Sequence, residues 1–336
     1  MSSTMRAAHV TALGPADSIR VGDLPRPSPG PGDVLVAVDT VAVNPVDTYV
    51  RSGRYPTPLP MPFVVGRDLV GTVAHAHPAS GFRSGEPVWC DSLGHDGRQG
   101  SFAEYAVVPA GRLYRVPDGA DPLTTVAVAH PAATAYLGWF VHARLRAGET
   151  VLVTGAGGNV GTAAVELAAA AGADVLATAR PEDHDRCRTS GAQAVWDYRD
   201  ATWPAQAAAY LRDRGRPGVD VYWDTPGLHD MDTAAPLLSP GARYLVTAAR
   251  LPSPDAPTPV PWGRLYTRDV SLLGFVISRA SVHDLAAAAG RINQLLPAGR
   301  LTARIAEVLP LEATADAHRR IEAGGVRGRL LVSVRG

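Results

Sequence analysis

Hydrophobic and polar positions divide the chain into a strand-rich first part and an alternating second part. Before residue 128, short apolar runs lie between proline- and glycine-rich turns, a pattern that predicts many short strands in a compact, partly open barrel. The segment Asn44–Tyr55 is predicted as a loop with a short helix. The predicted strands are Met5–Val10, Val34–Val43, Val64–Val73, Pro87–Cys90 and Phe102–Val108.

The second part alternates short apolar runs with helical segments, which predicts βα units and a doubly wound parallel sheet. Helices are predicted at Pro131–Arg144, from near Val160 to Gly172, and at Pro204–Arg212. The predicted strands are Val151–Val153, Asp174–Thr178, Ala194–Asp197, Val219–Trp223, Arg243–Thr247 and Val270–Phe275.

We predict that the C-terminal segment belongs to the same domain as the strand-rich first part of the chain. A helix at Val282–Leu296 and a strand at Leu330–Val334 follow the proline-rich segment Pro252–Trp262, which we expect to be an exposed loop. We predict one mostly β domain from residues 1–128 and 275–336. The doubly wound domain, residues 129–274, is inserted within it.

A glycine turn follows the first strand of the inserted domain. Gly155, Gly158 and Gly161 recur every three residues, with Asn159 and Val160 at the start of the next helix. Such a strand–turn–helix lets the backbone approach a diphosphate, and the helix N-terminus favours its negative charge. Spacing alone is weak evidence, but the surrounding strands and helix make a dinucleotide site the favoured interpretation.

The residue after the second strand discriminates between the two nicotinamide dinucleotides. NAD sites usually place an acid there for the ribose 2′-hydroxyl, whereas this chain has Arg180, 19 residues after Gly161 (180 − 161). A guanidinium suits a 2′-phosphate, so we predict NADPH. The alternative is an ordinary surface arginine.

Composition excludes several classes of function. The 336 residues have a formal net charge of zero, so there is no electrostatic case for nucleic acid binding. No apolar run has membrane-spanning length and the N-terminus lacks a signal-like apolar stretch, so we expect a cytoplasmic protein. The basic residues are all arginine, which excludes lysine-based Schiff-base chemistry.

Four segments carry a resemblance to a known family: Asn44–Asp47, Arg51–Tyr55, Gly66–Gly71 and Gly100–Tyr105. Together they resemble the medium-chain dehydrogenase/reductase superfamily, and most closely its zinc-independent NADPH:quinone oxidoreductase, or zeta-crystallin-like, branch. The resemblance implies a Rossmann domain inserted in a GroES-like catalytic domain, with NADPH as cofactor and a homodimer as the assembly. Later segments agree: Gly218–Val221, Leu238–Arg243 and Arg327–Leu330.

The residues at the zinc positions of related dehydrogenases differ here. The zinc-dependent branch has a cysteine where Asn44 stands and Gly-His-Glu where Gly66-Arg67-Asp68 stands. Its four-cysteine lobe is also missing, since only Cys90 and Cys187 occur in the chain. We therefore expect no metal, and hydride transfer to an activated acceptor.

The resemblance also implies site residues. Asn44 and Tyr49 are expected near the nicotinamide and its ribose, and Tyr55 on the substrate side as proton donor or packing residue. Asn44 as a loop cap, and Asp47 as a structural residue that fixes the loop or pairs with Arg51, are the alternatives for this segment. The expected cofactor-binding residues are Asn44, Thr134, Gly155, Gly158, Asn159, Val160, Gly161, Arg180, Tyr198, Phe275, Val276 and Arg327, with Arg199 as another candidate partner of Arg180.

Two further features bear on the pocket. His130-Pro131 departs from the family pattern beside Thr134, and the histidine is either a polar group of the site or part of the packing. Trp262 and Tyr266 offer aromatic rings that would suit a planar substrate.

The expected function is metal-free, NADPH-dependent reduction of a small-molecule quinone or enone. One alternative is an enoyl-thioester or polyketide tailoring reductase, which the fold alone does not distinguish. Another is a non-catalytic NADPH-binding sensor or structural protein.

Overall fold

The computed structural model describes residues 3–250 and 256–335 and divides into two compact units. The discontinuous unit consists of Met1–Ala133 and Ser281–Gly336, and the central unit of Thr134–Ala280. The predicted boundaries at 128 and 274 lie five and six residues before these (133 − 128 and 280 − 274). Within the described part of the chain, no helix is long and apolar enough to cross a membrane.

The discontinuous unit is built on two sheets. A seven-stranded sheet has the order β15-β16-β3-β5-β6-β8 with β7 also paired to β3, and a smaller one has the order β2-β1-β4. Alternate valines of β3 are completely buried, so this long strand forms the centre of the core. The strands are β1 (Thr4–Val10), β2 (Arg20–Pro25), β3 (Asp33–Ala42), β4 (Phe63–Val64), β5 (Leu69–Ala76), β6 (Pro87–Cys90), β7 (Tyr105–Pro109), β8 (Tyr114–Arg115), β15 (Ile305–Pro310) and β16 (Arg329–Ser333).

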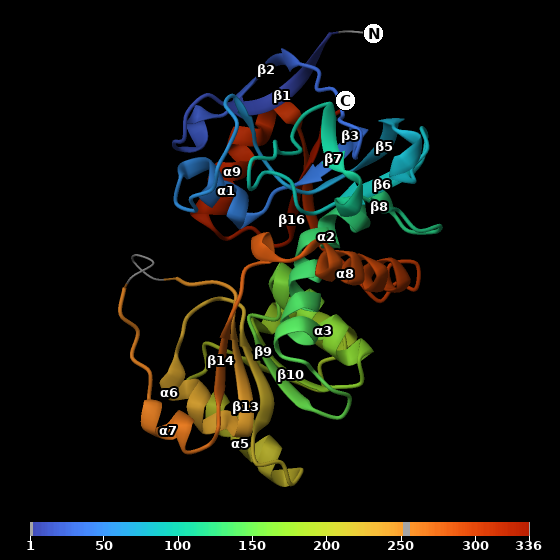
Figure 1. Ribbon diagram of the computed structural model, residues 1–336. Coiled ribbons are helices and arrows are strands. Elements are labelled where there is room, and N and C mark those ends of the chain that lie inside the picture. The colour runs from blue at the N-terminus through green and yellow to red at the C-terminus, as the bar shows by residue number, and fades with distance from the viewer. Residues whose placement is uncertain (1–2, 251–255, 336) are drawn as a thin grey trace. The chain divides into compact units, whose positions relative to one another are not determined.

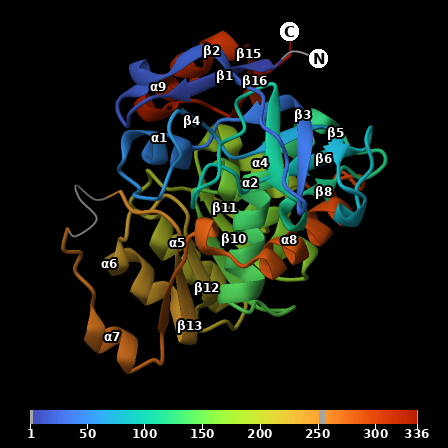
Figure 2. The same cartoon turned by 45° about the horizontal axis from the view of Figure 1, so that its top comes forward.

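Two short helices close one side of this unit. The helix α1 (Pro45–Ser52) packs against α9 (Thr314–Ala323), as Figure 2 shows. A third helix, α8 (Val282–Leu295), is anchored at Asn293, which accepts a hydrogen bond from Trp89 Nε1 at 3.0 Å. The helix α9 and the strands β2 and β15 were not predicted from the sequence.

The central unit contains a six-stranded, wholly parallel sheet of order β11-β10-β9-β12-β13-β14. Figure 1 shows β9, β10, β13 and β14 of this sheet with α3 (Asn159–Ala170) beside them. The order reverses between β9 and β12, the place where doubly wound sheets bind nucleotides. The strands are β9 (Thr150–Thr154), β10 (Asp174–Ala179), β11 (Ala194–Asp197), β12 (Val219–Asp224), β13 (Leu238–Val246) and β14 (Ser271–Gly274).

The remaining helices of the central unit are short. They are α4 (His184–Thr189), α5 (Trp203–Asp213), α6 (Met231–Ala234) and α7 (Trp262–Tyr266). Residues 252–255 of the predicted loop Pro252–Trp262 lie outside the described residues, and Trp262 begins α7. The predicted fold class, a doubly wound parallel sheet inserted in a mostly β unit, is confirmed.

The helix predicted at Pro131–Arg144 is wrong in its bounds. The structure has α2 at Pro122–Tyr136, followed by a π-helix at Leu137–His142. Asp121 begins α2 by accepting a hydrogen bond from Thr124 N at 2.7 Å, and Pro122 occupies the first helical position. Pro131 lies inside the helix, where it removes one backbone donor without ending it.

Candidate functional site

The glycine turn lies at the carboxyl end of β9, as predicted. Gly155 has φ +68°, and a Cβ on Gly161 would lie 2.2 Å from the Gly155 carbonyl oxygen. The third glycine is therefore required by the close packing of α3 on the turn. Gly158 is exposed, and Asn159 and Val160 are half-buried at the start of α3. The Ala156 and Gly158 N–H groups bond to the Thr178 and Gly155 carbonyl oxygens, so the first turn of α3 supplies the backbone donors for a diphosphate.

A second arginine, Arg186, which was not predicted from the sequence, holds this turn. The Arg186 guanidinium on α4 donates to the Gly157 carbonyl oxygen and to Thr162 Oγ1, the latter at 3.0 Å. Thr162 Oγ1 in turn donates to the Ala156 carbonyl oxygen at 3.0 Å. No motif of the sequence indicated these contacts, because α4 reaches the turn only through the sheet packing.

Arg180 and Tyr198 come together at the ends of neighbouring strands. Arg180 Nε donates to the Tyr198 hydroxyl at 3.1 Å, and both side chains are exposed. Arg199, a candidate partner of Arg180, is instead paired with Asp197, its Nε and Nη2 lying 3.0 to 3.2 Å from that carboxylate. Arg327, the other candidate, belongs to the discontinuous unit.

The other predicted cofactor residues of the central unit lie on α2 and after β14. Thr134 is buried on α2. Phe275 follows β14, donates its backbone N–H to the Val246 carbonyl oxygen at 3.2 Å, and stacks on His142 with ring centroids 4.4 Å apart. Val276 is half-buried beside it. Trp262 and Tyr266 are 65% and 75% exposed, so neither is held in a packed pocket.

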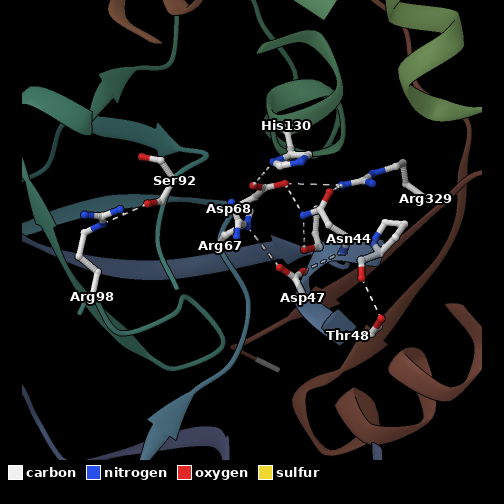
Figure 3. Close-up of polar contacts among 11 residues, drawn as sticks. Asn44, Asp47, Thr48, Arg67, Asp68, Ser92, Arg98, His130 and Arg329 are labelled. Atoms are coloured by element: carbon white, nitrogen blue, oxygen red, sulfur yellow. Dashed lines mark hydrogen bonds and ion pairs between the residues drawn. The ribbon is translucent and has the colours of Figure 1, made fainter. Parts of the chain in front are cut away.

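Asn44 belongs to a buried polar cluster in the discontinuous unit (Figure 3). Asn44 Nδ2 donates to Asp68 Oδ2 at 2.8 Å, and Arg329 Nη2 donates to Asn44 Oδ1 at 2.9 Å. The Asn44 backbone N–H donates to Asp47 Oδ2 at 2.8 Å, which fixes the start of α1. The amide is therefore engaged on both sides and completely buried.

Of the two structural roles given for Asp47, the structure has the first: Asp47 fixes the loop by accepting from Asn44 N, and it does not pair with Arg51. Asp47 Oδ1 lies 3.6 Å from Arg67 Nε, whereas Arg51 bonds to Glu322. His130 also joins the cluster, with Nδ1 3.8 Å from Asp68 Oδ1. The histidine is therefore part of the packing around the polar cluster, and a role in the site stays a prediction.

Burial and charge together set the protonation of this cluster. Burial raises the pKa of Asp47 to about 6, although Arg67 opposes the shift. Burial likewise raises the pKa of Asp91 to about 7 and that of Asp68 well above its usual value. Burial, with Arg67 and Arg329 nearby, lowers the pKa of His130, which is therefore neutral at pH 7.

The two predicted tyrosines lie on α1 and just after it, in the discontinuous unit. Tyr49 is 40% exposed, and the Arg54 guanidinium lies 4.7 Å from its ring centroid. Tyr55 is half-buried and stacks on His95, with ring centroids 5.6 Å apart and planes 17° apart. An open cavity of about 230 Å³ adjoins Tyr49, and its lining comprises Pro45, Thr48, Tyr49, Ser52, Arg54, Ile321 and Glu322.

Two protein families match the chain. The family described as alcohol dehydrogenase GroES-like domain matches residues 30–118, and that described as zinc-binding dehydrogenase matches residues 159–294. They correspond to parts of the discontinuous unit and of the central unit, respectively, and the second continues into α8.

Individual relatives extend the match to almost the whole chain. Human quinone oxidoreductase is 30% identical over 332 residues, 98% of this chain and 97% of that protein. A mycocerosic acid synthase-like polyketide synthase of Mycobacterium tuberculosis is 31% identical over 244 residues, 72% of this chain and 11% of that protein.

Among solved structures, mycobacterial Rv1454c complexed with NADPH is 27% identical with a TM-score of 0.82, covering 98% of this chain and 99% of that one. The full-length similarity shows an oxidoreductase that uses a nicotinamide cofactor. The chain belongs to the quinone oxidoreductase family of the medium-chain dehydrogenase/reductase superfamily.

Proposed function

We propose that the protein is an NADPH-dependent, metal-free reductase of quinones or activated alkenes. The observation that carries the proposal is the Arg180–Tyr198 contact at the end of β10. A guanidinium held by a phenol hydroxyl at this place suits the negatively charged 2′-phosphate of NADPH. It gains no charge-assisted contact from the neutral 2′-hydroxyl of NADH. That Rv1454c binds NADPH supports the same choice of cofactor.

The residues of the glycine turn fit the rest of the cofactor. Gly155 and Gly158 would shape the turn around the diphosphate, and Asn159, Val160 and Gly161 would hold it by the backbone N–H groups of the first turn of α3. Thr134, Phe275 and Val276 of the central unit would hold the nicotinamide end. Bound NADPH supplies a hydride to the acceptor.

The donor set of the buried cluster supports metal-free chemistry. Asn44, Arg67 and His130 offer an amide, a guanidinium and a neutral imidazole, and a cation among them would meet the positive charge of Arg67. Asp68 already receives a hydrogen bond from Asn44 and lies 3.6 Å from Arg329. This carboxylate oxygen, Asp68 Oδ2, is thus already engaged by an amide and a cationic side chain.

Tyr55 is our candidate for the proton donor to the reduced acceptor. Its phenol is half-buried beside His95, and a phenol can donate to an oxygen at which negative charge develops. Tyr49 and Arg54 line the cavity on α1 and would contact the acceptor. Asn44 would act mainly by positioning, because both sides of its amide are engaged in the cluster.

A tailoring reductase of polyketide or enoyl-thioester substrates is the second candidate function. Its support is the similarity to a segment of a mycobacterial polyketide synthase. A non-catalytic NADPH sensor remains a third hypothesis. We further infer a cytoplasmic homodimer, in which the edge strand β14 of the central sheet would pair with a second copy.

Replacing Arg180 by alanine tests the cofactor assignment. We expect the ratio of kcat/KM for NADPH to that for NADH to fall by roughly tenfold or more, because a charge-assisted contact with the 2′-phosphate is lost. Arg199→Ala is the matched control, since Arg199 is paired with Asp197 and the ratio should change little. An unchanged ratio in the Arg180 variant would refute the assignment.

A further inference from the structure

Two loops of the discontinuous unit hold Tyr55 against His95. Asp96 N donates to Thr57 Oγ1 at 2.9 Å, and Gly97 N donates to the Pro58 carbonyl oxygen at 2.9 Å. Gln99 adds two more contacts: its Nε2 donates to the Pro62 carbonyl oxygen at 2.8 Å, and its Oε1 accepts from Val64 N at 2.7 Å. These bonds tie the loop after Tyr55 to the loop that carries His95, so the stacked rings are fixed relative to each other.

The surroundings of the Nδ1 atom of His95 indicate which tautomer the neutral ring adopts. His95 Nδ1 is buried and has no hydrogen-bond partner among the residues that the structure describes. An N–H group left without an acceptor in the interior is rarer and costlier than an unused lone pair. In the neutral ring, the proton therefore belongs on Nε2, which makes Nε2–H a hydrogen-bond donor beside the Tyr55 ring.

The surroundings of His95 are electropositive and keep it neutral. Burial lowers the pKa of His95, and the charges of Arg67, Arg98 and Arg112 lower it further, while Asp96 opposes them. Arg98 is held in the same loop by a hydrogen bond from its Nε to the Ser92 carbonyl oxygen at 3.3 Å (Figure 3). An oxygen that gains negative charge near this ring is stabilised by the donor and by the arginines.

We propose that His95 Nε2–H donates a hydrogen bond to the carbonyl or quinone oxygen of the acceptor, beside the hydroxyl of Tyr55. The assignment rests on the proposed function, in which Tyr55 faces the acceptor. It adds a second donor for the oxygen at which charge develops as hydride arrives. It also restricts the acceptor to a carbonyl-conjugated class, since an isolated alkene has no oxygen to receive the bond.

Three substitutions at His95 separate this role from stacking. With NADPH and 9,10-phenanthrenequinone, His95→Leu should lower kcat roughly 10²-fold, the usual effect of losing one oxyanion donor. His95→Phe keeps an aromatic ring against Tyr55 but has no donor, so the loss should be the same. His95→Gln restores an N–H donor and should recover most of the activity. His75→Leu, at an exposed histidine on β5, is the matched control.

A spectroscopic measurement on the free protein is independent of turnover. ¹⁵N shifts of the His95 imidazole at pH 7 to 8 should report the Nε2–H tautomer, and the Nδ1–H tautomer would overturn the inference. If the wild type turns over the quinone and the kcat of the His95→Phe variant is within twofold of it, the inference is also overturned, and His95 is a stacking residue. No turnover of either a quinone or an enone by the wild type would instead refute the proposed function, with the tautomer still testing His95.

Discussion

His318 makes the stability of the discontinuous unit dependent on pH. Its side chain lies on α9, completely buried, and neither ring nitrogen has a hydrogen-bond partner among the described residues. The ring contacts the Phe102 ring edge to face, with centroids 6.2 Å apart. Burial, and to a smaller extent the charge of Arg51, lowers the pKa of His318 to about 3.

The sign of the effect follows from this shift. The unfolded chain binds a proton at His318 near pH 6.5, whereas the folded state does not until about pH 3, so stability is lost as the pH falls through this window. Between pH 7 and pH 5 this single group should lower the free energy of unfolding by about 2 kcal/mol. The raised pKa values of Asp47 and Asp91 act in the opposite direction, because the folded state binds those protons first.

A difference between variants isolates the histidine from these carboxyl groups. His318→Leu removes the titrating group at nearly the same volume. The difference in free energy of unfolding, variant minus wild type, should therefore be about 2 kcal/mol larger at pH 5 than at pH 7. Urea unfolding followed by circular dichroism measures it at both pH values. His283→Leu, at an exposed histidine of α8, is the control. A His318→Leu difference that is the same at both pH values would refute the reasoning.

Two more substitutions probe the turn and the buried cluster. Gly161→Ala places a Cβ 2.2 Å from the Gly155 carbonyl oxygen, so NADPH affinity measured by fluorescence titration should fall roughly tenfold or more, consistent with strained packing. Gly290→Ala, where nothing lies within 4 Å, should leave affinity unchanged, and equal effects would contradict this account. Arg329→Met should lower the free energy of unfolding by about 3 to 5 kcal/mol, because it leaves buried partners without a cation. Arg335→Met, in an exposed pair with Asp39, should cost less than about 1 kcal/mol, and similar losses for both would argue against the buried network.

The local features of the nucleotide site could be predicted because they depend on neighbouring residues. The spacing of the three glycines is a property of one turn, and the structure has it where the sequence places it. Arg180 and Tyr198 were predicted separately, and the sheet explains why they meet. Ala179 of β10 pairs with Asp197 of β11, so the next residues leave the sheet side by side.

The buried cluster could not be predicted, because it depends on pairing between distant strands. Leu331 of β16 pairs with Ala42 of β3 in antiparallel register, which brings Arg329 opposite Asn44 across 285 residues of sequence. The strand propensities of single residues do not predict which distant strands pair, because these propensities depend mainly on the surrounding structure. Asp121-Pro122 is a typical helix start, with a capping aspartate before a proline, but the prediction took Pro131 as the first helical residue.

The most direct test of the central claim is NADPH oxidation by the chelator-treated protein, followed at 340 nm with 9,10-phenanthrenequinone, 1,4-benzoquinone, an enone and crotonyl-CoA as acceptors. We expect acceptor-dependent oxidation of NADPH with a quinone or the enone, at the same rate before and after removal of metal ions. Preference for crotonyl-CoA would favour the tailoring reductase. Tight NADPH binding without turnover of any acceptor, or activity that returns only with added zinc, would contradict the account.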